Sequence, residues 1–254
     1  HGHRNWYGYR SDETDTSINL NSAVEFGEDW RVLSVYGDPK DVTFEYHYYP
    51  NTKHRTDMSP WREEAILKGD SKATPEERVQ ILVKQLRNTK GINEKWLNLS
   101  ISSFNFCRDV FYSVAWDDLH RIARGLFIDT LGWKILARGY VKFFNYNEKS
   151  FNSKQWLKDN LQFPVICYRK YNGFLAMASW DRTNERLFIA SKSTDESTHA
   201  SLAKEILEKY ADMAEITKYL QSRDVTMLFE ICTHKDPHII KEPERPVLLD
   251  IVRS

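Results

Sequence analysis

An alternation of apolar and polar residues is the first regular pattern in the chain. Residues Val42–Tyr49 alternate clearly, and Trp30–Val35, which follows the turn-like residues 27–29, and Ser17–Leu20 are also predicted to be strands. Two or three strands alone are marginally stable. The pattern therefore predicts a small β segment that packs on another part of the protein.

Apolar runs separated by turn-forming residues predict further strands after residue 120. The runs Ile122–Ile128 and Trp133–Gly139 flank the turn at residues 129–132, so they are expected to pair as a hairpin. Strands of the same kind are predicted at Phe163–Tyr168, Phe174–Trp180, Arg186–Ser191, Val225–Cys232 and Val247–Val252. The second and third of these form a hairpin, and the last two form a buried pair.

Three helices are predicted. One precedes the first hairpin, and two lie between the later strands Arg186–Ser191 and Val225–Cys232. Thr74 is an N-cap, Pro75 takes the first helical position and Glu77 the third, which is a capping box that opens a helix. Apolar stripes within residues 202–210 and 213–220 predict two more helices. The polar, proline-containing residues 51–72 are expected to be a linker.

Composition indicates a globular protein with a buried core, because 41% of the residues are hydrophobic and 28% are charged. Thirty-six basic residues balance thirty-six acidic ones, so any site for a polyanion such as RNA must be a local concentration of charge. There is no run of 18 apolar residues and no signal-peptide pattern. Cys107, Cys167 and Cys232 are few and far apart, which favours reduced thiols and a cytoplasmic location without membrane attachment.

Lys170 and Gly173 form a K-x-x-G pattern between two predicted strands, where a lysine would project from a rigid turn. The pattern is weak alone, because chance produces it in a chain of this composition. Arg124, Arg138 and Lys142 lie beside or near glycines at strand ends and fit phosphate contact, although each taken singly fits a surface cation equally well.

Glu230 lies within an apolar strand and needs a partner for its charge, which a ribose, a metal or a lysine could supply. The aromatic segment Trp96–Asp118 contains few basic residues, so we expect its rings to be core rather than base-stacking groups.

Five short motifs together carry a family resemblance over residues 100–254. They are Arg124-Gly125, Lys142–Asn145, Lys170 with Gly173, Ser191-Lys192, and Phe229–Ile231. In order and spacing they resemble the adenylyltransferase domain of ATP-dependent RNA ligases of the phage RNA ligase 1 type, relatives of fungal tRNA ligase. The resemblance implies an α+β fold, the covalent nucleotidyltransferase fold that is unrelated to ATP-grasp, with antiparallel sheets around a nucleotide cleft. This domain would occupy residues 73–254, after a β segment and linker at 1–72.

The resemblance also implies the roles of individual residues. Lys170 would attack the α-phosphate of ATP and hold AMP as a phosphoramide, with Mg²⁺ neutralising the departing pyrophosphate. An ammonium group is no nucleophile, so neighbouring cations are needed to favour the neutral amine. The residues expected to contact ATP are Arg124 and Lys142 at the triphosphate, Phe144 in the nucleotide site, Gly173 beside the nucleophile, Lys192 near the phosphates and Glu230 at the ribose. The AMP would pass to an RNA 5′-phosphate, and a 3′-hydroxyl would displace it in RNA repair or tRNA splicing.

Some features depart from that family. Its further Glu-Gly pair and Lys-x-Lys motif would follow Ser254, so we expect the sequence to be an internal piece of a longer protein. His1–Arg4, with later glycine and asparagine residues, faintly resembles the end of a calcineurin-like phosphatase domain, although two histidines cannot complete a metal site. Asn172 and His238 replace residue types common in phage relatives. The alternatives are a capping enzyme, a DNA ligase, or a non-catalytic RNA-binding domain.

Overall fold

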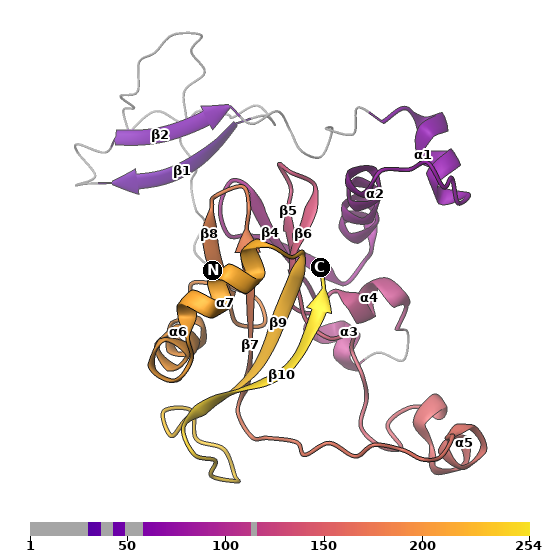
Figure 1. Ribbon diagram of the computed structural model, residues 1–254. Coiled ribbons are helices and arrows are strands. Elements are labelled where there is room, and N and C mark those ends of the chain that lie inside the picture. Colours follow the sequence, from indigo (N-terminus) through magenta and orange to yellow (C-terminus); the bar gives the residue numbers. More distant parts are fainter. Residues whose placement is uncertain (1–29, 37–42, 49–57, 113–115) are drawn as a thin grey trace. The chain divides into compact units, whose positions relative to one another are not determined.

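The computed structural model describes residues 30–36, 43–48, 58–112 and 116–254 (Figure 1). The chain divides into two units, His1–Ile81 and Leu82–Ser254. The predicted strand Ser17–Leu20 and the segment His1–Arg4 lie outside the described residues.

The first unit contains two of the predicted strands and a helix that was not predicted. Strands β1 (Trp30–Tyr36) and β2 (Thr43–Tyr48) pair antiparallel, which confirms both strands. Helix α1 (Pro60–Leu67) begins with a proline at its first turn inside the region expected to be a linker, so that expectation is wrong there. Its Ile66 is buried, and Arg62 pairs with Asp70 and Glu77 in the chain that follows the helix.

Helix α2 (Pro75–Asn88) begins with the predicted capping box. The Thr74 N–H donates to Glu77 Oε2 at 2.9 Å, and the Glu77 N–H donates to Thr74 Oγ1 at 3.1 Å. The two hydrogen bonds satisfy donors that a helix start leaves unpaired. Val83 and Leu86 on its apolar face are buried.

The second unit contains two four-stranded antiparallel sheets. In the first sheet the strand order is β3-β4-β5-β6, and the predicted hairpin is confirmed as β5 paired with β6. Ile122 was assigned to that hairpin wrongly, because Asp117 caps a short helix that ends at Ile122. The strands are β3 (Ile92–Trp96), β4 (Ile101–Phe106), β5 (Leu126–Asp129) and β6 (Lys134–Arg138), with helices α3 (Arg108–Tyr112) and α4 (Asp118–Ile122) between β4 and β5.

The second sheet has the order β10-β9-β7-β8 and confirms four of the predicted strands. The two helices predicted between β8 and β9 are also confirmed. The elements are β7 (Phe174–Asp181), β8 (Arg186–Ala190), α6 (Thr198–Tyr210), α7 (Met213–Gln221), β9 (Val225–Cys232) and β10 (Arg245–Arg253).

The core has two parts, one on each face of the second sheet. Ala176 and Ala178 of β7 pack with Ile206 of α6, whereas Met177 between them packs with Phe127 of the first sheet. This alternation follows from the two-residue period of a strand. The second sheet is therefore covered by helices on one face and by the first sheet on the other, which confirms an α+β architecture of antiparallel sheets.

The predicted strand Phe163–Tyr168 is wrong. After β6 the chain leaves the sheets, forms the short 3₁₀ helix η1 (Ser150–Asn152) and helix α5 (Lys154–Asn160), and returns to β7 (Figure 1). Residues 161–170 on the return path are all exposed and have no strand structure. An apolar run becomes a buried strand only where a neighbouring strand completes its hydrogen bonds, and Pro164 lacks a donor for such a ladder.

None of the helices in the described ranges is long and apolar enough to cross a membrane. Cys107, Cys167 and Cys232 are free thiols.

Candidate nucleophile and phosphate site

The K-x-x-G segment leads directly into β7 and lies against β9. The Gly173 N–H donates to Glu230 Oε1 at 3.0 Å. A Cβ atom at Gly173 would lie 2.2 Å from the Ile231 carbonyl oxygen, so only glycine permits this close approach. Lys170 is exposed, and its Nζ donates to the Tyr171 carbonyl oxygen at 3.2 Å.

Glu230 is half-buried beside this segment. Burial raises the pKa of Glu230, while the hydrogen bond from Gly173 and the positive charges of Lys170 and His238 act in the opposite direction. The structure thus brings three predicted site residues together, Lys170, Gly173 and Glu230.

Arg169 holds the chain immediately before Lys170. Its Nη2 donates to both carboxylate oxygens of Glu242 at 3.0 Å, and the Glu242 side chain is 2% exposed. The guanidinium of Arg169 also lies 4.8 Å from the Tyr171 ring centroid, and Arg245 lies 5.7 Å from the same ring. Sequence analysis missed Glu242, because a single carboxylate in a polar loop carries no pattern that distinguishes it from a solvated one.

Arg124, Lys142 and Lys192 form a cluster of cations. Burial lowers the pKa of all three, and in Lys192 the positive charges of Arg124 and Lys142 lower the pKa further. In Lys142 the charges of Arg124 and Lys149 act in the same direction, and Glu148 opposes them. These three residues come from distant parts of the sequence, so the fold concentrates positive charge although the chain has none in excess.

Aromatic rings lie beneath these cations. Lys142 Nζ is 4.3 Å from the Phe144 ring centroid, and Lys149 Nζ is 5.3 Å from it. The Phe144 ring has edge contacts with Trp116 at 5.3 Å and Phe151 at 5.5 Å. Such contacts between cations and rings are favourable and fix the side chains relative to one another. Lys149 belongs to this group, although sequence analysis did not assign it a role.

The aromatic segment before β5 contributes to the same group, contrary to its assignment as core. Phe106 lies 4.9 Å from Trp116, and Lys192 Nζ lies 5.4 Å from the Phe106 ring. Phe104 is fully buried as expected, but Tyr112 is 69% exposed. We call Arg124, Lys142, Lys149 and Lys192 with Phe106, Trp116 and Phe144 the cation–aromatic cluster.

Strand register places Glu230, beside Lys170, and Lys192, of the cation–aromatic cluster, at the same end of the strands of the second sheet. Leu175 of β7 pairs with Glu230 of β9. On the other side of β7, Ala190 pairs with Met177 and ends β8, so Lys192 follows at the level of Leu175. Neighbouring strands are about 4.8 Å apart. Glu230 and Lys192 therefore flank the start of β7.

Glycines allow the first sheet to approach this edge. A Cβ atom at Gly125, where φ is +65°, would lie 2.9 Å from Met177 Cε of β7, and one at Gly139 would lie 3.1 Å from the Arg124 carbonyl oxygen. Because glycine has no Cβ atom, both positions allow close packing around the start of β7. Lys170 Nζ itself is hydrogen-bonded within its own turn rather than to the cation–aromatic cluster.

The described residues do not form a resident magnesium site. No group of three or more histidine, cysteine, aspartate or glutamate side chains in the part of the chain that the structure describes could hold a metal ion. Mg²⁺ usually keeps several waters and is bound through one or two carboxylates together with substrate phosphates, so an ion here would be held mainly by bound ATP and water.

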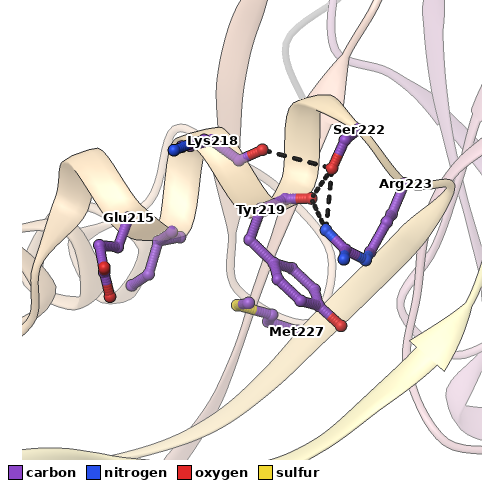
Figure 2. Close-up of a pocket in the computed structure, with 7 residues that line it drawn as sticks. Glu215, Lys218, Tyr219, Ser222, Arg223 and Met227 are labelled. Atoms are coloured by element: carbon purple, nitrogen blue, oxygen red, sulfur yellow. Dashed lines mark hydrogen bonds between the residues drawn. The ribbon is translucent and has the colours of Figure 1, made fainter.

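A separate pocket of about 430 Å³ lies along α7 and is lined by none of these residues (Figure 2). Arg223 lies 3.9 Å from the Tyr219 ring centroid, and its Nη1 donates to the Tyr219 carbonyl oxygen and to Ser222 Oγ. The guanidinium of Arg223 is therefore paired at the end of α7.

The site is an exposed lysine on a glycine-containing turn beside a half-buried glutamate, with a cation–aromatic cluster at the same sheet edge, on an α+β domain. The family model for RNA ligases of the T4 RNA ligase 1 type matches residues 122–252, just over half of the chain. The chain belongs to this family of RNA ligases. The matched range contains every site residue that the sequence predicted. A comparison with curated proteins found no match.

Proposed function

We propose that this chain carries the adenylyltransferase site of an ATP-dependent RNA ligase, with Lys170 as the nucleophile. Family membership supports RNA ligase function in general. The observation that carries the mechanism is the Lys170–Gly173–Glu230 arrangement at the sheet edge where Lys192 also lies. A nucleotide bound there would have its reacting phosphate near a lysine and its remaining oxygens near fixed cations.

In the first step the neutral amine of Lys170 attacks the α-phosphorus of ATP. The N–P bond forms, the bond from the α-phosphorus to the β-phosphate oxygen breaks, and pyrophosphate leaves with the electron pair. Arg124, Lys142 and Lys192 stabilise the negative charge on the leaving group, because fixed cations in a partly desolvated cluster need no rearrangement. Glu230 would accept hydrogen bonds from the ribose hydroxyls.

In the later steps the RNA 5′-phosphate displaces Lys170 from AMP, and a 3′-hydroxyl then displaces AMP to form the phosphodiester bond. Each is a phosphoryl or nucleotidyl transfer in which positioning and charge stabilisation supply most of the catalysis. RNA ends in repair or in tRNA splicing are the proposed substrates, and ATP is the nucleotide.

Substitution of Lys170 tests the assignment. In the full-length protein incubated with ATP and Mg²⁺, we expect mass spectrometry to find one AMP on the peptide that contains Lys170. Both Lys170→Ala and Lys170→Arg should abolish it, because arginine keeps the charge but cannot lose its proton. If the lysine only binds phosphate, arginine should retain part of the activity.

Nucleotide selectivity separates the proposal from its alternatives. An adduct formed from GTP rather than ATP would indicate a capping-type enzyme. AMP found on another residue would overturn the role of Lys170, and a wild-type protein without any covalent nucleotide would indicate a non-catalytic RNA-binding domain.

A further inference from the structure

Exposed aromatic side chains are concentrated on the segment between β6 and β7. Six of the nine exposed aromatic residues in the described ranges lie between residues 141 and 168. Single exposed apolar residues are normal, but a concentration of them marks an interaction site. We call these six the aromatic surface: Phe143, Tyr146, Phe151, Trp156, Phe163 and Tyr168.

The same segment is strongly basic in a chain with no net charge. Residues 141–170 contain six lysines and arginines and only two acidic residues. Lys154 and Lys158 flank Trp156 on α5, and all three side chains are exposed. Both acidic residues have local partners, since Glu148 accepts from the Asn145 N–H and Asp159 from the Gln155 amide. Six basic minus two acidic residues leave the segment with a net charge of +4, part of which the ion pair of Arg169 with Glu242 offsets.

We propose that the aromatic surface and its lysines bind an unpaired stretch of RNA next to the end that is joined, an inference that rests on the proposed ligase function. Proteins that bind single strands combine cations along the backbone with aromatic rings on which bases stack. A duplex hides its base faces, so it could use the lysines but not the rings. The presence of both aromatic residues and lysines along this segment therefore favours single-stranded RNA over a duplex.

The position of the surface relative to Lys170 fits this role. Tyr168 is two residues from Lys170, and residues 161–170 are exposed and non-helical. Even fully extended, the backbone between Phe163 and Lys170 spans no more than about 25 Å. An RNA held on these rings would therefore have its 5′-phosphate within reach of AMP on the lysine. The ion pair of Arg169 with Glu242 fixes the end of the surface that meets the nucleophile.

Binding of RNA without ATP tests the surface directly. The probe is a 5′-phosphorylated single-stranded oligoribonucleotide, and its affinity is measured by fluorescence anisotropy. We expect Trp156→Ala with Tyr168→Ala to weaken binding about fivefold or more, the smallest decrease expected for one stacked base. Trp61→Ala removes a tryptophan outside the surface that is even more exposed than Trp156, and it should leave the affinity unchanged.

Salt dependence tests the contribution of the lysines. Lys154→Ala with Lys158→Ala should reduce the slope of log affinity against log salt by about 0.7 for each RNA phosphate that the wild-type lysines neutralise. The duplex form of the same oligonucleotide should bind more weakly than the single strand and should not respond to the aromatic substitutions.

The surface and the ligase proposal fail in different ways. Formation of lysyl-AMP needs ATP and Mg²⁺ but no RNA, so Trp156→Ala alone, on α5 and away from the loop of Lys170, should form it at the wild-type rate. If lysyl-AMP forms but RNA affinity is unaltered in the aromatic variants, the surface proposal is overturned and the ligase proposal stands. If RNA affinity falls as expected but the wild type never forms lysyl-AMP, the reverse holds. Aromatic variants that change only the sedimentation of the protein would show that the surface binds protein instead of RNA.

Discussion

Glu230 carries its carboxylate in a place where the protein disfavours charge. Burial on β9 raises its pKa, and only one hydrogen-bond donor, the Gly173 N–H, reaches it in the part of the chain that the structure describes. A ligand that offers hydroxyl donors would compensate for this loss of hydration. The residue is thus better suited to a bound ribose than to the free protein.

The pH dependence of stability should report this unfavourable charge. Because the pKa of Glu230 is higher in the folded protein than its ordinary value of 4.5, its proton stabilises the fold fully below that value. The contribution is lost as pH rises through the folded pKa. Glu230→Gln removes it while keeping the size and the hydrogen-bond acceptor for Gly173.

Urea unfolding between about pH 4 and pH 7 measures the effect. The free energy of unfolding of the wild type, relative to Glu230→Gln, should decrease as pH rises. The difference is needed because Glu244 acts in the opposite direction. The pKa of Glu244 is lowered from 4.5 to about 2, so its carboxylate stabilises the fold above pH 4.5, and this stabilisation is lost as pH falls toward 2. A constant difference across the range would contradict the role of burial at Glu230.

At the scale of elements, the loop that carries Lys170 has no strand partner of its own before β7. Its position depends on the pair between exposed Arg169 and buried Glu242, and on Tyr171 between two arginines. Removing Arg169 would leave a buried carboxylate without its partner, which is more unfavourable than losing an exposed pair. We therefore propose Glu242 as a positioning residue for Lys170, the proposed nucleophile.

We expect Arg169→Ala to loosen residues 168–173 and to slow lysyl-AMP formation. Solvent screening of Arg169 limits the local effect to about 1 kcal/mol, or roughly a fivefold increase in amide hydrogen exchange. The exchanged pair Arg169→Glu with Glu242→Arg should restore part of both properties. Arg182→Ala, which breaks an exposed pair with Asp224 elsewhere, is the matched control. An effect in the control equal to that of Arg169→Ala would remove the basis for the positioning role.

Elements with their own periodicity were predictable, and those that depend on partners were not. The strand Val225–Cys232 was predicted with its observed bounds because its apolar run is buried between the helices and the first sheet. The run Phe163–Tyr168 has similar composition but no neighbouring strand, and it is exposed. Helix α1 was missed because its eight residues carry no apolar stripe, and Ile66 is its one buried residue.

The candidate site also contains residues that motifs predict and residues whose contacts are visible only in the folded structure. Lys170, Gly173 and Glu230 were found from motifs and the fold brings them together. Lys149 and Glu242 were missed because their roles arise from neighbours that are distant in sequence or unremarkable in type. A sequence pattern records the side chains that chemistry requires, but not the ones that hold them in place.

At the scale of the second unit, stability depends on the packing between its two sheets. Phe127 of β5 and Phe188 of β8 are fully buried and meet edge to face with centroids 5.2 Å apart. Met177 and Leu228 of the second sheet belong to the same core. Because the site residues come from both sheets, disruption of this core would separate Arg124 and Lys142 from Glu230.

Phe127→Ala should lower the free energy of unfolding by about 3–5 kcal/mol, through reduced burial and the cavity that remains. A double-mutant cycle with Phe188→Ala should give a coupling of about 0.5–1.5 kcal/mol for the ring pair. Phe143→Ala, at an exposed ring, should change stability by less than about 0.5 kcal/mol. Additive effects of the two core substitutions would show that the rings do not interact.

The segment between β6 and β7 also has a consequence for how such proteins diverge. It is anchored near Phe144, through ring contacts, and again at Arg169, through Glu242, while α5 between these points lies apart from the sheets (Figure 1). Each doubling of a flexible loop costs only about 0.6 kcal/mol in closure entropy. Insertions and deletions between the two anchors would therefore leave both sheets and the nucleophile in place. With the proposed role of the segment in RNA binding, such changes would alter which RNA is accepted in each lineage and leave the position of Lys170 unchanged.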